Sequence, residues 1–426
     1  MTVGASAGGR CAAPRVGLFG LLGTGNIGND ASMEAVLGFL RRDRPDATLD
    51  AMCAGPDRVR DVYGIEAVPL FWHHRHEPQA SAVTALALKA LGKCIDTFKT
   101  VSWVRRHDVV IVPGMGVLEA SLPLRPWEAP YSLFLLGVSG RLFGTKVAFV
   151  SVGANVINQR LTRWLVNSAA RLAFYRSYRD TLSRDAMRQR GLDTTRDHVF
   201  PDLVFGLPPP PYEPGDAQTV GIGVMAYYGT NDDRRRADEI HLTYVETMKS
   251  FVRWLVEGGR RVRLLVGDES DERVVGEILA DLREHRPGMD PAWVVAEPVA
   301  SFAELMKAMA PASTVVATRY HNVMCALKLG KPAISLGYAA KNVALMADAG
   351  LSEFCQSANS PDLERLIEQF RELEVSAPNL TQTIMERNAA NAQLVDQQFA
   401  ELNRVLFPAL SRVPGLAEAK SVRTGA

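Results

Sequence analysis

The chain has 426 residues, of which 47% are hydrophobic and 22% are charged, and its formal net charge is +1. This length is sufficient for two domains of ordinary size, and the composition is that of a soluble globular protein. A net charge near zero provides no overall field that would attract nucleic acid, so we predict no nucleic-acid partner.

Cysteine usage and hydropathy indicate the compartment. The five cysteines are scattered without metal-ligand spacing, which is typical of a reducing, cytoplasmic environment. Residues 1–14 are expected to be flexible and lack the apolar segment of a signal peptide. The most apolar long segment, Ala82–Val104, is interrupted by lysines, which favours an amphipathic surface helix or a loop over a membrane-spanning helix. Peripheral contact with the inner face of a membrane stays open as an alternative.

The first element in the chain is a strand, Arg15–Gly20, which a glycine-rich turn connects to the following helix. Such a turn lets backbone N–H groups approach a phosphate or a hydroxyl-rich ligand. The letters of Gly23-x-Gly25-x-x-Gly28 also match a dinucleotide-binding fingerprint, for which Asp50 would be the acidic residue about 20 positions later. A third interpretation is that the glycines only permit a tight turn.

Strands and helices alternate through both halves of the chain, as in doubly wound parallel sheets. In the first half we predict further strands at Thr48–Met52, Ile65–Pro69, His107–Val112 and Lys146–Val152, and a helix at Trp127–Gly140. In the second half we predict strands at Val220–Met225, Val262–Val266, Ala292–Val295, Thr314–Ala317 and Ala333–Leu336. The helices predicted there are His241–Glu257, Ser301–Ala310, one from about Asn322, Leu363–Leu373 and Thr381–Val405.

A proline-rich run separates the two halves. Residues 208–211 are consecutive prolines, which cannot continue a helix or a central strand. We therefore predict an N-terminal α/β domain at 15–206, a linker at 207–218, a C-terminal α/β domain at 219–410 and a disordered tail at 411–426. Two doubly wound, Rossmann-like domains with C-terminal helices suggest a glycosyltransferase-B-like arrangement, with loops facing a cleft.

Charged side chains follow two neighbouring strands of the second half. Arg319 and His321 come directly after one predicted strand, and Lys341 comes after the next. Because ligands bind outside the carboxyl ends of parallel strands, we expect these groups to converge. Two cations and one titratable group suit an anion and a proton transfer. The alternatives are a helix-capping histidine and a structural ion pair for Arg319.

Several motifs together resemble the polysaccharide pyruvyl transferase family. They are G-L-L-G-T-G-N-I-G-N-D-A at 20–31, Y-R-D-T-L-S-R at 178–184, R-Y-H and A-L-K-L-G-K-P within 319–332, and L-G-Y-A-A-K-N-V-A-L-M-A-D-A-G-L at 336–351. The resemblance implies a glycosyltransferase-B-like fold and transfer of a pyruvyl group from phosphoenolpyruvate to a sugar. The product is a cyclic ketal, phosphate is released, and the acceptor is a sugar of a polysaccharide, a glycolipid or a lipid-linked precursor.

This resemblance also implies roles for individual residues. Phosphoenolpyruvate carries a phosphate and a carboxylate, so Arg319, Lys341 and Arg179 are expected to bind the donor. His321 is the expected general acid, because a histidine titrates near neutral pH. Asp30 is the expected base, beside acceptor-binding positions in the opposite domain. Those acceptor-binding positions are Gly25, Asn26, Gly28 and Asn29.

No metal and no cofactor are expected beyond the donor substrate. The run His73-His74-x-His76 has no carboxylates at ligand spacing, so we interpret it as a solvated or acceptor-facing loop. For Arg179-Asp180, a surface ion pair before a helix is the alternative to ligand binding.

The chain departs from the family pattern at two places. Asn29 stands where many members have the aspartate, and Asp30 follows it. Met225–Tyr228 contains no arginine, although many members carry one at the end of this strand. Two other functions therefore stay open, a nucleotide-sugar glycosyltransferase of glycosyltransferase-B type and a non-catalytic carbohydrate- or anion-binding protein.

Overall fold

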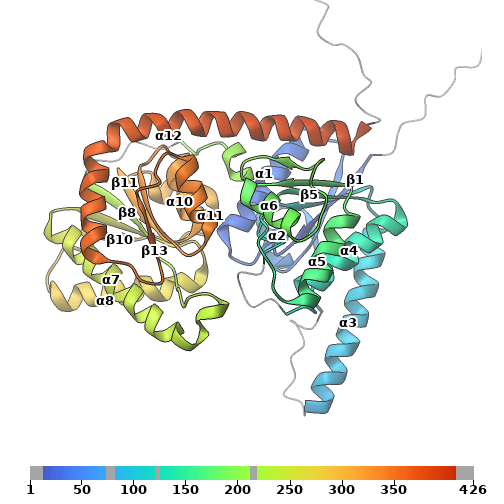
Figure 1. Cartoon of the computed structure of the whole chain (residues 1–426), viewed down its shortest axis with the longest axis horizontal. Helices are drawn as coiled ribbons and strands as arrows, with labels where there is room; N and C mark the ends of the chain where they lie inside the picture. The colour runs from blue at the N-terminus through green and yellow to red at the C-terminus, as the bar shows by residue number, and fades with distance from the viewer. Residues whose placement is uncertain (1–12, 73–81, 120–124, 212–217, 409–426) are drawn as a thin grey trace, which may run out of the picture.

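A computed structural model describes residues 13–72, 82–119, 125–211 and 218–408. It contains two fully parallel sheets, each flanked by helices, that lie side by side (Figure 1). Both sheets have the strand order of a doubly wound fold, in which the first strand lies at the centre and the chain winds outward in both directions. The predicted fold class, two Rossmann-like domains followed by C-terminal helical structure, is confirmed.

The first sheet has the order β3-β2-β1-β4-β5-β6-β7. Its strands are β1 (Arg15–Gly20), β2 (Thr48–Cys53), β3 (Glu66–Pro69), β4 (Val109–Pro113), β5 (Lys146–Val152), β6 (Tyr175–Tyr178) and β7 (His198–Val199). Its helices are α1 (Ile27–Asp43), α2 (Pro56–Tyr63), α3 (Ala82–Val104), α4 (Ala129–Phe143), α5 (Arg160–Leu172) and α6 (Thr181–Gln189). A short 3₁₀ helix, η2 (Leu203–Gly206), follows.

The second sheet repeats this order as β10-β9-β8-β11-β12-β13. Its strands are β8 (Thr219–Gly223), β9 (Arg261–Leu265), β10 (Val294–Ala296), β11 (Thr314–Ala317), β12 (Ala333–Gly337) and β13 (Cys355–Ser357). Its helices are α7 (Ala237–Glu257), α8 (Glu272–His285), α9 (Phe302–Met309), α10 (Tyr320–Lys328), α11 (Ala340–Asp348) and α12 (Leu363–Leu406). The 3₁₀ helices η3 (Asn231–Arg236), η4 (Glu269–Asp271) and η5 (Pro291–Trp293) lie in the connections.

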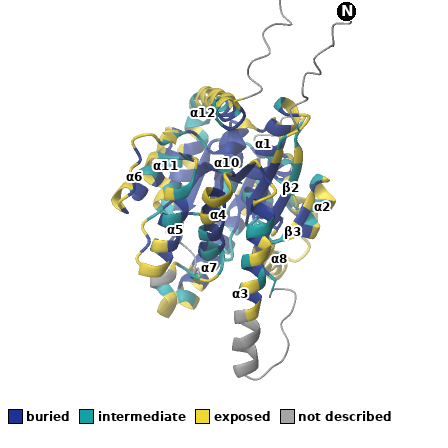
Figure 2. Ribbon diagram, turned by 90° about the vertical axis from the view of Figure 1, so that its right-hand side faces the viewer, coloured by how far each residue is buried: buried dark blue, intermediate teal, exposed yellow. Residues whose placement is uncertain are grey.

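The central strands read as near-continuous apolar runs because helices cover both faces of a parallel sheet. In β4, for example, all five residues of Val-Val-Ile-Val-Pro are buried. Figure 2 shows the buried residues concentrated on the strands and on the inner faces of the helices, and the exposed residues on the outer faces. In open α/β sheets of this kind, ligands bind at the loops beyond the carboxyl ends of the strands.

The helix α12 is one continuous helix of 44 residues, where the sequence predicted two separate helices. Pro378 lies inside it, and a proline removes one backbone hydrogen bond and bends a helix without ending it when tertiary packing holds both sides. Figure 1 shows that α12 changes direction and then runs across both halves of the molecule.

The C-terminal part of α12 packs on the first domain. Phe399 stacks on Phe39 of α1, with ring centroids 4.7 Å apart. The Gln398 side chain accepts a hydrogen bond from Ser151 Oγ at 3.0 Å and donates to Ser177 Oγ at 2.8 Å. Although the sequence-based boundaries assign this segment to the second domain, in the structure α12 belongs to both and ties them together.

Some predictions lie on residues outside the described part of the chain. These are most of the flexible N-terminus at 1–14, part of the linker at 207–218, the tail at 411–426, and the histidine run at 73–76. The segment Ala82–Val104, predicted as a surface helix or loop, is the helix α3. None of the helices in the described part of the chain combines the length and apolar character that crossing a membrane requires.

Candidate active site

The N-termini of α1 and α10 face each other across the domain boundary. The backbone N–H of Ile27 donates to the carbonyl oxygen of Gly267 in the other domain at 3.3 Å. A Cβ atom on Gly28 would lie closer than 3.0 Å to Nδ1, Cε1 and Cγ of the His321 ring. The imidazole thus lies directly against the glycine turn, and only a residue without a side chain fits there. Helix N-termini carry partial positive charge, so this boundary favours an anion.

Next to His321 lies an ionic cluster of the buried Glu119 and Arg179 and the half-buried Lys341. Arg179 Nη2 contacts Glu119 Oε1 at 2.5 Å, and Lys341 Nζ contacts Glu119 Oε2 at 3.0 Å. Burial alone would raise the pKa of Glu119, but the cations of Lys341 and Arg179 outweigh it and lower that pKa to about 2. The carboxylate is therefore charged and bridges cations from the two domains.

Glu119 is the member of this cluster that the sequence analysis did not identify. It follows β4 and the glycine-rich turn Pro113–Val117, so its place at a strand's carboxyl end was the available signal. Its contacts require small neighbours, because a Cβ on Gly153 would lie closer than 3.0 Å to both Glu119 and Arg179. A Cβ on Gly116 would approach Glu119 Cδ to 2.8 Å.

Tyr320 packs its ring against both cations. The Arg179 guanidinium lies 4.8 Å from the ring centroid and Lys341 Nζ lies 5.5 Å from it, which are distances for cation–π attraction. Arg179 Nη1 also lies 3.7 Å from Asp202 Oδ2, and Arg179 Nε lies 3.7 Å from Asp180 Oδ2. These distances exceed a hydrogen bond, so Glu119 is the close partner of Arg179 among the described carboxylates.

His321 is a neutral imidazole at neutral pH in this arrangement. Burial lowers its pKa most, and the cations of Arg179 and Lys341 lower it further, to about 3. A neutral imidazole cannot donate a proton as an acid until the surrounding charge changes. The expected acid role thus requires an anion that offsets the two cations.

Arg319, expected to bind the donor, forms a bidentate ion pair. Its Nε and Nη2 atoms contact Asp271 Oδ2 and Oδ1, both at 2.8 Å. Asp271 is fully buried and also accepts the backbone N–H of Ala226 at 2.9 Å. In this conformation the alternative interpretation of Arg319, a structural ion pair, describes these contacts, while its role toward a donor stays a prediction.

Asp30 and the glycine turn form a second local network. Asp30 Oδ1 accepts the Gly23 N–H at 2.7 Å, and its Oδ2 atom, which has no hydrogen-bond partner among the described residues, lies 3.7 Å from Arg58 Nε. Burial raises the pKa of Asp30, and the Gly23 hydrogen bond and Arg58 oppose this. The carboxylate holds the turn through one oxygen, while its other oxygen is buried near Arg58 without a hydrogen bond.

The positions expected to bind the acceptor mainly organise this turn. Asn26 caps α1 by accepting the N–H of Asn29 at 3.2 Å, and Asn29 Nδ2 donates to the carbonyl oxygen of Leu21 at 3.1 Å. Gly25 adopts φ = +84° and faces Glu269 of the other domain. Of the two glycines among these positions, Gly28 is the one at which a side chain would meet His321. Their role in acceptor binding stays a prediction.

The structure does not place Asp50 as the acidic residue that dinucleotide binding at the glycine turn would require. Asp50 is the third residue of β2 and lies away from the strand's carboxyl end. Its Oδ1 atom contacts Trp103 Nε1 and His107 Nε2, both at 2.9 Å. A carboxylate held in this way is not placed to receive a ribose hydroxyl.

The family model for polysaccharide pyruvyl transferase matches residues 26–339, which include Gly28, His321 and, of the ionic cluster, Glu119 and Arg179. The chain therefore belongs to the polysaccharide pyruvyl transferase family, a family of transferases, as the motifs predicted. A comparison with curated proteins finds no match.

Solved structures similar to this chain share its glycosyltransferase-B arrangement. A putative UDP-N-acetylglucosamine 2-epimerase from Listeria monocytogenes has a TM-score of 0.58 at 11% identity, covering 93% of this chain and 98% of its own. UDP-GlcNAc 2-epimerase from Neisseria meningitidis has 0.57 at 11%, with 92% and 99% covered. A lipopolysaccharide outer core galactosyltransferase has 0.52 at 11%, with 93% and 100% covered. At these identities the likeness shows the fold alone.

Proposed function

We propose that this protein transfers a pyruvyl group from phosphoenolpyruvate to a saccharide and forms a cyclic ketal with release of phosphate. The observation that carries the proposal is the pair of cations, the buried Arg179 and the half-buried Lys341, that meet beside His321 from the two domains. Together with the N-terminus of α10, they form an environment suited to an anionic donor. The family membership supports the reaction class.

In this proposal, the donor supplies the negative charge that the surroundings of His321 need to offset the two nearby cations. The phosphate and carboxylate of the donor bind next to Arg179 and Lys341. Arg319 can also bind the donor if its guanidinium leaves Asp271 and pairs with the donor instead. Negative charge at this place offsets the two cations that lower the pKa of His321, so the pKa of the imidazole rises when the donor binds. Donor binding thereby protonates the acid.

The proton and bond changes balance in two additions. His321 protonates C3 of phosphoenolpyruvate, and one sugar hydroxyl forms a bond to C2 while giving its proton to a base. The bond between C2 and the phosphate oxygen then breaks, and the second sugar hydroxyl closes the ketal at C2. One hydroxyl proton replaces the proton that His321 gave to C3, and the other leaves with phosphate.

Two buried carboxylates near the site are candidates for the base. Asp30 Oδ2 and Asp202 Oδ2 both lack a hydrogen-bond partner among the described residues. Burial raises the pKa of each, which improves a carboxylate as a base. Asp30 lies at the glycine turn and Asp202 lies beside Arg179, so the position of the acceptor decides between them.

Phosphate release from phosphoenolpyruvate tests this function. We would measure it with a panel of sugar acceptors for the wild type, His321→Gln and Lys341→Gln, with the exposed His285→Gln as the matched control. Acceptor-dependent release that only the first two substitutions abolish is the expected result. Turnover of a nucleotide sugar without any binding of phosphoenolpyruvate would establish the glycosyltransferase instead. Donor binding without turnover across the panel would favour a binding protein.

We further propose that the protein works in the cytoplasm at the inner face of a membrane, where α3, α4 and α5 contact anionic lipid. These helices lie side by side (Figure 1), and their outer faces carry Phe98, Leu142 and Trp164 with 75%, 71% and 54% of the residue exposed. By sequence, their sole acidic residue is Asp96, which is buried. Among the residues whose side chains are described, their basic residues are Lys93, Lys99, Arg141, Arg160, Arg163 and Arg171. Exposed apolar side chains among basic ones suit an anionic bilayer surface.

A further inference from the structure

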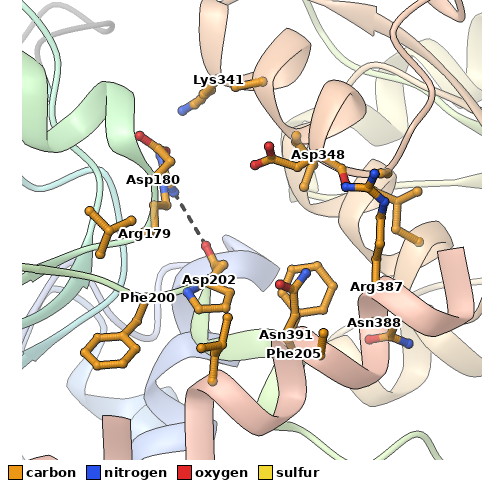
Figure 3. A pocket seen from close by; sticks show the side chains of 18 of the residues that line it. Arg179, Asp180, Phe200, Asp202, Phe205, Lys341, Asp348, Arg387, Asn388 and Asn391 are labelled. Carbon is orange, nitrogen blue, oxygen red and sulfur yellow. Dashed lines mark hydrogen bonds and ion pairs between the residues drawn. The ribbon is translucent and has the colours of Figure 1, made fainter. Parts of the chain in front are cut away.

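A cavity of about 400 Å³ lies between the two domains, beneath α12 (Figure 3). Its walls come from the loops after β6 and β7, from α11 and from α12. Residues that represent these walls are Phe200, Asp202, Leu345, Asp348, Asn388 and Asn391. A volume of this size is within the range of small-molecule sites, about 300–1,000 Å³.

The cavity adjoins the ionic cluster. Arg179, Lys341 and Tyr320 line it, and the same three side chains contact one another around Glu119. Figure 3 shows Arg179 and Lys341 on one side of the cavity and Asn388, Asn391 and Arg387 on the other. A molecule in the cavity would therefore reach the cations that the proposed donor uses.

Two buried oxygen atoms in the cavity wall lack hydrogen-bond partners among the described residues. They are Asp202 Oδ2, on a residue with 3% exposure, and Asn388 Oδ1. Asp202 Oδ1 accepts the Val204 N–H at 3.3 Å and Asn388 Nδ2 donates to the carbonyl oxygen of Lys328, so both side chains are fixed. Leaving buried acceptors without hydrogen bonds costs free energy, which the ion pair of Asp202 Oδ2 with Arg179 Nη1 at 3.7 Å offsets only in part, so the site favours a ligand that supplies donors.

The remaining lining is partly apolar. Phe200, Leu345, Ile384 and Leu394 supply carbon surface to the same lining. A sugar ring has both features that this lining requires, because its hydroxyls donate hydrogen bonds and its C–H faces pack on apolar side chains. A second molecule of phosphoenolpyruvate would not satisfy the carboxylate oxygen of Asp202, since its phosphate and that carboxylate are both hydrogen-bond acceptors.

We propose that this cavity binds the saccharide acceptor, with Asp202 and Asn388 accepting hydrogen bonds from its hydroxyls. That the bound saccharide is an acceptor rests on the proposed pyruvyl transfer, but saccharide binding itself can be measured independently of that reaction. It places the acceptor under α12, whereas the sequence analysis expected it at the glycine turn. It also places Asp202, together with Asp180 and Asp348, among the carboxylates that line the acceptor's cavity.

Adjacent alanines on α12 provide a matched test. Ala390 lines the cavity and Ala389 does not, and both are exposed, so neither substitution creates a core defect. Ala390→Trp fills the cavity mouth, and Ala389→Trp adds the same side chain beside it. Binding of the methyl glycosides of glucose, galactose, mannose and N-acetylglucosamine would be followed by ligand-observed NMR, and binding of phosphoenolpyruvate by calorimetry.

We expect at least one glycoside to bind the wild type and Ala389→Trp, and Ala390→Trp to weaken it by about tenfold or more. Phosphoenolpyruvate affinity should be equal in all three proteins. Loss of phosphoenolpyruvate binding in Ala390→Trp alone would overturn the inference and assign the cavity to the donor. It would also be overturned if no glycoside bound, or if both variants bound alike. Glycoside binding that Ala390→Trp blocks, in a protein that never consumes phosphoenolpyruvate, would refute the proposed function and leave the saccharide site standing.

Discussion

Replacing Gly28 by alanine should separate His321 from the glycine turn while leaving the fold intact. The added Cβ would lie closer than 3.0 Å to three atoms of the imidazole, and Gly28 is in the first turn of α1. Ordinary carbon contacts begin at about 3.5 Å, so the ring and the helix must move apart by more than about 1 Å, and most at the nearest atom, Nδ1. A shift of about 1 Å at reacting groups can reduce a rate by about a hundredfold.

The same helix contains a glycine that serves as the control. Gly38 is exposed, and a Cβ there would meet nothing within 4 Å. Gly38→Ala should raise the free energy of unfolding by roughly 0.5–1 kcal/mol, because alanine favours the helix over glycine. Gly28→Ala has the same propensity gain but also a clash, for which overpacking costs of about 1–3 kcal/mol are typical.

Both variants would be compared by urea unfolding and by phosphate release from phosphoenolpyruvate with an active acceptor. We expect Gly38→Ala to keep wild-type turnover and Gly28→Ala to lose about two orders of magnitude in kcat while it remains folded. Equal turnover in the two variants would refute the conclusion that contact between Gly28 and His321 positions the imidazole.

Three further predictions concern the ionic cluster, the histidine and the surface. Glu119→Gln leaves Arg179 and Lys341 without their close carboxylate, so we expect a loss of about 3–5 kcal/mol in unfolding free energy, against less than about 1 for the exposed Glu246→Gln. Phosphoenolpyruvate should then raise the melting temperature of Glu119→Gln more than that of the wild type, because its anion no longer competes with the Glu119 carboxylate for the two cations. An equal rise would contradict this competition. Because the pKa of His321 is lowered to about 3 from about 6.5, the unfolded chain binds more protons in this range, so stability falls as pH falls below about 6.5. Urea unfolding at pH 7 and pH 5 should show this fall reduced in His321→Gln by up to about 1.4 kcal/mol per pH unit, and identical pH dependence would exclude a buried neutral imidazole. The double substitution of Phe98 and Leu142 by serine should abolish sedimentation with phosphatidylglycerol vesicles, whereas Val375→Ser, an exposed position on α12, should not. Unchanged binding, or equal binding to neutral vesicles, would count against the lipid surface.

Much of the fold follows from local pattern in the sequence. The bounds of β1, β5 and β11 agree with the predicted strands, because buried parallel strands are apolar runs with clear polar or glycine borders. The prediction divided the long helix α12 into Leu363–Leu373 and Thr381–Val405, and Pro378 lies in the gap between these two segments. The continuity of α12 depends on packing across both domains, which involves residues far away in the chain.

The site illustrates the same limit. The motifs located Arg319, His321 and Lys341, because each follows a strand that the sequence identifies. Glu119 was missed because its meaning comes from Arg179 and Lys341, which lie 60 and 222 positions away. The pairing of Arg319 with Asp271 depends in the same way on two separate loops meeting. Spacing along the chain identifies candidates, and tertiary contact decides their charge and their partners.

The position of Glu119 links donor binding to the contact between the domains. Glu119 and Arg179 belong to the first domain and Lys341 belongs to the second, so the bond between Lys341 and Glu119 is an interdomain bond. A donor anion that binds both cations competes with Glu119 for Lys341 and leaves a buried carboxylate to be accommodated. Because an unpaired buried charge is costly, the donor must either remain within reach of both cations or allow water to reach Glu119. We therefore expect the domain contact at Gly28 and His321 to change when the donor binds. The Gly28→Ala variant thus tests the contact between the domains as well as the position of the histidine.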